Sequence, residues 1–319
     1  MYIVTGAAGF IGSYLVEELN RRFGEQVILV DRLDDDERWK NLQKLKYIDF
    51  IDADEFLMSL EEIPADLIQG VFHMGACSST TETDMGYLME NNTNYSKALF
   101  AYCAEFNIPF IYASSAATYG AGELGYSDNE DLVPKLKPLN RYGYSKQLMD
   151  EWALKQPVSP DRWAGVKFFN VYGPNECHKA GMRSVVIQAF EQINNSDKMK
   201  LFKSHKEGYA DGEQLRDFVY VKDVVNAMIE LMHKEKCENG IYNLGTGVAR
   251  SFKDLVVATF KAMNKEPNIE FIDMPEHLQA QYQYFTQADM EKSFRNLDMK
   301  FHSLEEGVTD YVQSFLMSC

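Results

Sequence analysis

Two side chains that could perform acid–base chemistry lie four positions apart at the start of a predicted helix. Tyr142 and Lys146 belong to the segment Tyr-Gly-Tyr-Ser-Lys, and residues i and i+4 of a helix share one face. A lysine ammonium near a phenol favours the phenolate and lowers the phenol pKa, which is otherwise about 10. The pair could supply a base near neutral pH, although an isolated pair with this spacing is more often an ordinary surface pair.

Hydroxyl groups precede this pair at the end of a predicted strand. The apolar residues 108–113 predict the strand, and Ser114, Ser115 and Thr118 follow it before Gly120. In open parallel sheets, ligands bind outside the carboxyl ends of the strands. We therefore expect these hydroxyls at a ligand site.

A glycine-rich turn near the start of the chain predicts a nucleotide site. Gly6, Gly9 and Gly12 lie between the apolar run 2–4 and a segment with helical periodicity. Gly6 permits a sharp turn, Gly9 lets backbone N–H groups approach a pyrophosphate, and Gly12 lets the helix pack on the strand. The pyrophosphate would lie at the positive end of the helix dipole. The alternative is a glycine turn that binds no ligand.

The residues after the second apolar run bear on the choice of cofactor. Asp31 ends the run 27–30, 19 residues after Gly12, where an acid that binds a ribose hydroxyl is expected. Arg32 and Arg38 follow, and a guanidinium at this position could bind the 2′-phosphate of NADP. Asp31 favours a free 2′-hydroxyl, as in NAD, and the arginines could also be ordinary solvated loop residues.

Composition limits the classes of function. With 319 residues, 45% of them hydrophobic, the chain can bury a large core and is expected to form two lobes. A net charge of −16 argues against a nucleic-acid or membrane partner, and no leader or membrane span is predicted. Five cysteines without a C-x-x-C pair indicate reduced thiols in the cytoplasm and no metal site.

The other apolar segments predict the remaining strands of a parallel sheet. One of them, residues 70–74, leads into Gly75, Ala76 and Cys77, which are small enough to let the backbone approach a ligand. One long helix is predicted over residues 86–106, with the polar Asn91 and Asn92 inside it. The further predicted strands are 47–51, 163–169, 215–221 and 242–247.

The order of these motifs resembles the extended branch of the short-chain dehydrogenase/reductase superfamily. A glycine turn, a strand-end serine and a Y-x-x-x-K motif follow one another within 146 residues. The resemblance implies that Tyr142 is the catalytic acid/base and that Ser115 hydrogen-bonds the reacting oxygen. It also implies that Lys146 binds the nicotinamide ribose and lowers the pKa of Tyr142.

Seven further segments resemble one family more closely, the ADP-L-glycero-D-manno-heptose 6-epimerases, which make a heptose precursor of the lipopolysaccharide core. The resemblance implies a tightly bound NADP, with NAD as the less favoured cofactor, and a homo-oligomer, a pentamer in the family. It also implies that Lys179 is the second proton-transfer group. The segments are GACSSTTE (75–82), ASSAATYG (113–120), YGYSK (142–146), FNVYGPNECHK (169–179), RDFVYV (216–221), YNLGTG (242–247) and YQYFTQAD (282–289).

The family resemblance also assigns binding residues. The residues expected to line the cofactor site are Gly6, Gly9, Phe10, Ile11, Gly12, Asp31, Arg32, Arg38, Gly75, Ala76, Cys77, Asn91, Lys146 and Val171. Those expected to line the site of the ADP-heptose are Ser78, Asn170, Gly181, Gln188, Phe202, Arg216 and Tyr282.

The chain departs from the family at several of these places. The family commonly has lysines where Arg38 and Ala53 stand, a serine at Gly181 and a histidine at Gln188, and its segment 204–214 is shorter and less polar. These differences leave the acid–base residues intact. They affect the sugar contacts and the preference for NADP.

We predict an α/β protein with a Rossmann-type doubly wound parallel sheet and a smaller α/β substrate lobe. Residues 1–169 with about 217–245 would bind the dinucleotide, and residues 170–216 with about 246–319 would bind the substrate. The predicted reaction is epimerisation at C6 of ADP-D-glycero-D-manno-heptose through transient oxidation to a ketone. The alternatives are another nucleotide-sugar epimerase, such as a UDP-hexose 4-epimerase, and a non-catalytic NADP-binding module.

Overall fold

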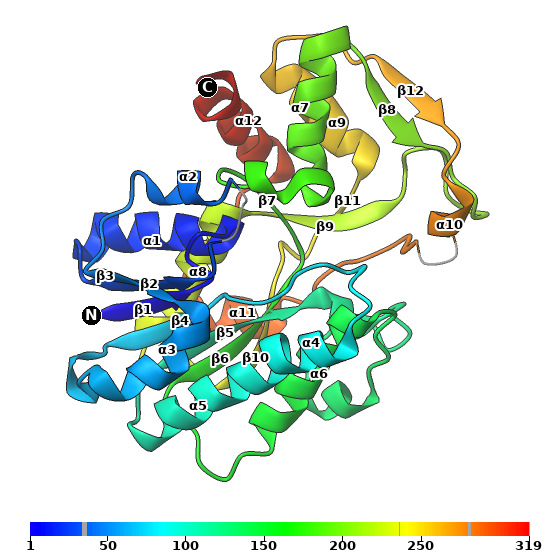
Figure 1. The fold of residues 1–319 in the computed structure, drawn as a ribbon. Helices are drawn as coiled ribbons and strands as arrows, with labels where there is room; N and C mark the ends of the chain where they lie inside the picture. Colours follow the sequence, from blue (N-terminus) through cyan, green and yellow to red (C-terminus); the bar gives the residue numbers. More distant parts are fainter. Residues whose placement is uncertain (34–36, 236, 280–281, 319) are drawn as a thin grey trace.

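Seven parallel strands form the central sheet of the protein (Figure 1). The computed structural model describes residues 1–33, 37–235, 237–279 and 282–318. The inner strands are short runs of apolar residues, as expected when both faces of a sheet are covered. Their order is β10 (Gly240–Leu244), β6 (Trp163–Phe168), β5 (Phe110–Ser115), β4 (Gly70–His73), β1 (Tyr2–Thr5), β2 (Val27–Asp31) and β3 (Asp49–Asp52).

Helices cover both faces of this sheet (Figure 1). One face carries α1 (Phe10–Phe23), α2 (Trp39–Leu42) and α8 (Val221–His233), and their apolar side chains share one hydrophobic cluster. A second cluster lies under α3 (Ala53–Ser59), α5 (Tyr95–Glu105) and α6 (Arg141–Leu154) on the other face. The predicted doubly wound Rossmann-type fold is confirmed.

The strand order reverses at β1. Thr5, the last residue of β1, lies between Val30 of β2 and His73 of β4. The connections from β1 and from β4 leave on opposite faces of the sheet, which opens a crevice at the carboxyl ends of the strands. The glycine turn follows β1 directly, so it lies at this crevice.

A smaller α/β lobe lies beside the carboxyl ends of the strands (Figure 1). Its elements lie in residues 170–220 and 249–314, so the strand predicted over 215–221 belongs to this lobe and not to the large sheet. The residue limits proposed for the two domains stay a prediction. α11 (Glu291–Asn296) packs on β10 of the large sheet. The lobe contains a sheet of β11 (Ala249–Ser251), β9 (Leu215–Tyr220) and β7 (Asn170–Tyr172), a parallel pair of β12 (Ile269–Ile272) and β8 (Met199–Phe202), and the helices α7 (Val185–Ser196), α9 (Phe252–Ala262), α10 (Glu276–Gln279) and α12 (Leu304–Ser314).

The helix predicted over residues 86–106 is present as one unbroken helical stretch, residues 85–105, but it is not α-helical throughout. It consists of α4 (Met85–Leu88), a π-helical turn over Met89–Asn94, and α5. Single π-helical turns of this kind often occur at functional sites, and the turn contains both asparagines. Among the helices that the structure describes, none is long and apolar enough to cross a membrane.

Candidate active site

The glycine turn has the close contacts that its sequence predicts. Gly6 has a φ of +66°, and a Cβ atom there would lie 2.6 Å from the backbone nitrogen of Gly75. A Cβ atom on Gly12 would clash with the carbonyl oxygen of Gly6. Gly9 is the N-cap of α1, and no side chain caps this end of the helix. The first-turn N–H groups of α1 therefore suit an anionic ligand such as a pyrophosphate.

Asp31 is the centre of a polar cluster at the end of β2. Its carboxylate accepts hydrogen bonds of 2.8 Å from the backbone N–H of Ala8 and of 2.8 Å from that of Arg32. The guanidinium of Arg38 forms an ion pair with it at 2.9 Å, and Arg32 pairs with Asp54. Asp31 thus fixes the glycine turn as well as facing the site, and Arg38 offsets its negative charge.

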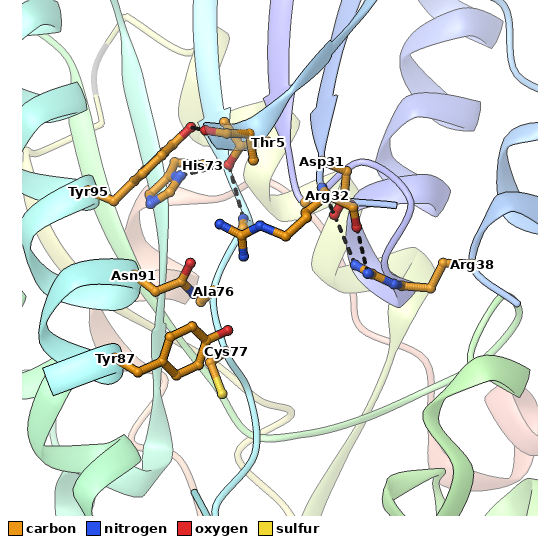
Figure 2. Close-up of a pocket in the computed structure, with 13 residues that line it drawn as sticks. Thr5, Asp31, Arg32, Arg38, His73, Ala76, Cys77, Tyr87, Asn91 and Tyr95 are labelled. Carbon is orange, nitrogen blue, oxygen red and sulfur yellow. Dashed lines mark hydrogen bonds and ion pairs between the residues drawn. The ribbon is translucent and has the colours of Figure 1, made fainter. Parts of the chain in front are cut away.

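One pocket brings together most of the residues predicted to bind the cofactor (Figure 2). In this view Asn91, Cys77 and Tyr87 lie on one side, and Asp31 and Arg38 lie on the other. The predicted residues that line it are Gly6, Asp31, Arg32, Arg38, Gly75, Ala76, Cys77 and Asn91, joined by Thr5, Ala53, His73, Tyr87 and Tyr95.

A buried chain of hydrogen bonds supports the floor of this pocket. The N–H of Gly75 donates to the hydroxyl of Thr5, whose oxygen lies 2.6 Å from Nδ1 of His73. On the other side, Nε2 of His73 lies 2.8 Å from the hydroxyl of Ser96, which donates to the carbonyl of Asn92. Burial lowers the pKa of His73 to about 3, so this histidine is neutral and structural.

Asn92, in the π-helical turn, holds the loop that follows β4. Its side-chain oxygen accepts from the N–H of Cys77 at 2.8 Å, and its amide donates to the carbonyl of Cys77 at 3.0 Å. The same amide donates to the hydroxyl of Ser145 on α6. Asn92 is fully buried. It therefore joins the cofactor pocket to the helix that carries Tyr142 and Lys146.

Tyr142 lies in the first turn of α6, which Asn140 caps by accepting from the N–H of Gly143 at 2.8 Å. Burial raises the pKa of Tyr142, and a hydrogen bond with the hydroxyl of Ser115 opposes this effect. The structure thus joins the predicted acid/base to the predicted serine. The direction of the pKa shift is opposite to the one we predicted, because burial outweighs the favourable contacts.

Lys146 is buried one helical turn after Tyr142. Its Nζ donates to the carbonyl of Ala113 on β5 at 2.9 Å. Burial lowers its pKa to about 8, with an opposing effect of Asp150. The ammonium is thereby held at the carboxyl end of β5, between the sheet and the loop of Cys77.

Lys179 lies in the loop after β7, where a buried carboxylate organises the chain. Glu176 accepts from the N–H of Gly173 at 3.3 Å and from the hydroxyl of Ser184 at 2.6 Å. Nζ of Lys179 lies 5.4 Å from the centroid of the Phe10 ring on α1. Burial lowers the pKa of Lys179, and Glu176 opposes the shift. Phe10 and Lys179 are far apart in the sequence, so the sequence alone did not predict this contact between the two lobes.

Two of the predicted substrate residues lie together in the second lobe. The guanidinium of Arg216 lies 5.3 Å from the ring centroid of Tyr282 and 5.5 Å from that of Phe252. It also donates to the carbonyl of Gln283, whose side chain donates to the carbonyl of Gly120 at 2.5 Å. The irregular segment after residue 281 therefore connects Arg216 to the turn that follows β5.

The other predicted binding residues are more dispersed. Phe10 and Ile11 begin α1 beside the glycine turn, and Val171 pairs with Val219 between β7 and β9. Gln188 donates from α7 to the carbonyl of Arg183 at 2.7 Å, and a Cβ atom on Gly181 would meet nothing within 4 Å. Ser78 and Asn170 are exposed, and Phe202 ends β8.

Sequence reasoning missed the supporting role of Asp150. For Asn92 it left two possibilities open, a bond to the backbone at the site or simple exposure, and the structure shows the bond to the backbone. The signal for Asp150 was its spacing, four residues after Lys146 on the same helical face. The signal for Asn92 was a polar residue on the apolar side of a helix. In the part of the chain that the structure describes, no group of three histidine, cysteine or acidic side chains could hold a metal ion.

Comparison with known proteins decides the family. Residues 2–245 match the NAD dependent epimerase/dehydratase family. The chain belongs to this family. The ADP-L-glycero-D-manno-heptose-6-epimerase of Fusobacterium nucleatum subsp. nucleatum is 52% identical, and the match covers 99% of this chain and 98% of that protein. The predicted resemblance to the 6-epimerases is thereby confirmed, and a non-catalytic module is not supported.

Solved epimerase structures share the fold. The crystal structure of the Helicobacter pylori ADP-L-glycero-D-manno-heptose-6-epimerase has a TM-score of 0.80 and 29% identity, covering 98% of this chain and 95% of that one. MoeE5, in complex with UDP-glucuronic acid and NAD, has a TM-score of 0.77 and 26% identity, covering 100% and 99% of the two chains. MoeE5 thus holds NAD and a UDP-sugar in this fold.

Proposed function

We propose that this protein inverts C6 of ADP-D-glycero-D-manno-heptose to give the L-glycero epimer, using a bound nicotinamide dinucleotide, NADP rather than NAD. The observation that carries the proposal is the placement of Tyr142 one helical turn before the buried Lys146, whose Nζ donates to the carbonyl of Ala113 on the strand that ends at Ser115. The names of the relatives support the choice of substrate.

The chemistry explains why an oxidoreductase fold suits an epimerisation. The hydrogen on C6 is not acidic, so direct deprotonation is prohibitive, whereas oxidation to a ketone makes the carbon planar. When bound, the nicotinamide ring supplies hydride removal and hydride return. Tyr142 takes the hydroxyl proton during oxidation, and Ser115 donates a hydrogen bond to the same oxygen. The ketone then rotates to present its other face, and Lys179 donates a proton to the oxygen.

The glycine turn and its pocket fit the dinucleotide. The uncapped start of α1 would hold the pyrophosphate, Asp31 and Arg38 would hold the adenosine ribose, and Lys146 would hold the nicotinamide ribose. Arg38 offsets the charge of Asp31, which removes the repulsion that Asp31 would otherwise exert on a 2′-phosphate. On this argument Arg38→Met should weaken NADP binding much more than NAD binding, as titration of each nucleotide would measure.

The remaining roles concern the nucleotide sugar and the assembly. Arg216, stacked on Tyr282, would bind the diphosphate, with Ser78, Asn170, Gly181, Gln188 and Phe202 around the sugar. A cytoplasmic homo-oligomer, a pentamer as in the family, that binds neither nucleic acid nor membrane stays a prediction. Light scattering coupled to size-exclusion chromatography would measure its mass.

The direct test is to incubate the purified protein with ADP-D-glycero-D-manno-heptose and no added cofactor, then to separate the two C6 epimers by chromatography. Conversion to the L-glycero form would establish the substrate, the reaction and a retained cofactor. Lack of conversion even with added NADP would contradict the proposal. The same assay with UDP-glucose would then test the alternative, a UDP-hexose 4-epimerase.

A further inference from the structure

A buried ion pair between β6 and α6 hydrogen-bonds the residues that flank Ser115 and has no part in the roles proposed so far. Nζ of Lys167 on β6 lies 2.7 Å from Oδ2 of Asp150 on α6, and both side chains are 0% exposed. Burying two opposite charges is expensive, and an apolar pair of the same size is often equally stable. The pair therefore calls for an explanation other than stability.

The hydrogen bonds of the pair enclose Ser115 on both sides. Asp150 accepts from the hydroxyl of Ser114, the residue before Ser115, at 2.7 Å. Lys167 donates to the hydroxyl of Thr118 at 2.6 Å, and Thr118 donates to the carbonyl of Ser115 at 2.8 Å. The ion pair thus holds the backbone immediately before Ser115 and the turn immediately after it.

The same carboxylate fixes the helix that carries the acid/base. Asp150 lies on α6 eight residues after Tyr142 and four after Lys146, and its other oxygen accepts from the hydroxyl of Tyr112 on β5 at 2.9 Å. Gly165 of β6 makes this contact possible, because a Cβ atom there would collide with the Tyr112 hydroxyl. One carboxylate therefore joins α6 to β5 about two helical turns after Tyr142.

We propose that Asp150 and Lys167 are positioning residues that set the hydroxyl of Ser115 against the phenol of Tyr142. Neither residue touches the substrate. The pair acts by fixing β5, its following turn and α6 in one register. This inference rests on the proposed roles of Ser115 and Tyr142, and it adds the ion pair that keeps the two hydroxyl groups in position.

The test is the double variant Asp150→Asn/Lys167→Met, which removes both charges without leaving an unpaired one. We expect a folded protein that still binds the dinucleotide, with kcat lowered about tenfold to a hundredfold because small displacements of reacting groups are costly. KM for the nucleotide sugar should stay within about threefold. The matched control is Glu151→Gln/Lys155→Met, an ion pair at the end of the same helix whose side chains are 24% and 66% exposed, which should leave kcat within about twofold. A kcat of the buried double variant within that range would overturn the proposal.

A second measurement does not depend on the substrate. In protein labelled with ¹³C-tyrosine, the Tyr142 signal, assigned with Tyr142→Phe, is titrated across the alkaline range. Cys77 and Asp150 raise the pKa of Tyr142, and the hydrogen bond with Ser115 lowers it. Removing the Asp150 carboxylate by itself lowers the midpoint, so a midpoint equal to or above that of the wild type would report loss of the Ser115 contact, and a lower midpoint would overturn the positioning role. If the wild type fails to convert the heptose, the proposed function fails, and this titration still decides the role of the pair.

Discussion

The ammonium of Lys179 lies 5.4 Å from the centroid of the Phe10 ring, so the loop after β7 contacts the first turn of α1. Asn175 in the same loop donates to the hydroxyl of Ser13 on α1 at 3.1 Å. The loop predicted to carry the second proton-transfer group therefore rests on the helix predicted to hold the pyrophosphate. A cation over an aromatic face in a partly buried site is an attractive contact, and it keeps the amine beside the cofactor turn.

Replacing Lys179 tests whether two groups exchange protons. Lys179→Met should slow epimerisation about a hundredfold or more, while a half-reaction on an aldehyde analogue of the sugar survives through Tyr142. Both rates are measured by chromatography of the products, with the exposed Lys200→Met as control. Equal loss of both reactions would mean that Lys179 only binds the substrate.

Replacing Tyr142 tests the acid/base itself. Tyr142→Phe removes one oxygen and should lower kcat about 10²- to 10⁴-fold, with the dinucleotide still bound because its predicted contacts are untouched. The neighbouring Tyr144, 48% exposed, provides the control Tyr144→Phe, which should keep normal activity. A Tyr142→Phe protein that unfolds or loses the dinucleotide would contradict this account.

The buried amine of Lys146 should make stability depend on pH. Its pKa is lowered by burial to about 8 from 10.5 in the unfolded chain, so the unfolded state binds more protons between these values. The free energy of unfolding of the wild type, relative to Lys146→Met, should therefore rise with pH across this window, by about 3 kcal/mol in total. Below about pH 8 the Lys146 amine is charged in both the folded and the unfolded state, so the full cost of burying this charge lowers the free energy of unfolding.

Urea unfolding of both proteins at several alkaline pH values would measure this difference. Lys155→Met, which removes a largely exposed lysine from the same helix, should show no such trend against the wild type. A flat difference for Lys146→Met would mean that the Lys146 amine is hydrated in the folded protein.

Asn92 should affect the affinity for the dinucleotide although it does not line the pocket. Asn92→Ala leaves the buried N–H and carbonyl of Cys77 unpaired and should destabilise the fold by about 1–3 kcal/mol. Dinucleotide affinity should fall about tenfold, because the loop of residues 75–77 loses its support. Isothermal titration would measure it, with the exposed Asn94→Ala as control. Unchanged affinity would show that the loop holds its shape without this amide.

The sequence by itself determined the features that depend on local geometry. The turn with Gly6 and Gly12 could be predicted because a side chain at either position collides with neighbouring backbone. The spacing of Tyr142 and Lys146 places them on one face of α6 by helical periodicity alone. Apolar runs likewise predicted the strands of a parallel sheet, because both of its faces are buried.

Only the tertiary structure decided how these groups behave. The pKa of Tyr142 is raised rather than lowered because burial outweighs the opposing hydrogen bond with Ser115, 27 residues away. The hydrogen bonds of Asn92 with Cys77 and the ion pair of Asp150 with Lys167 have the same origin. Each joins segments that are distant in sequence, and its energy depends on the packing that excludes water, which no local pattern of residues records.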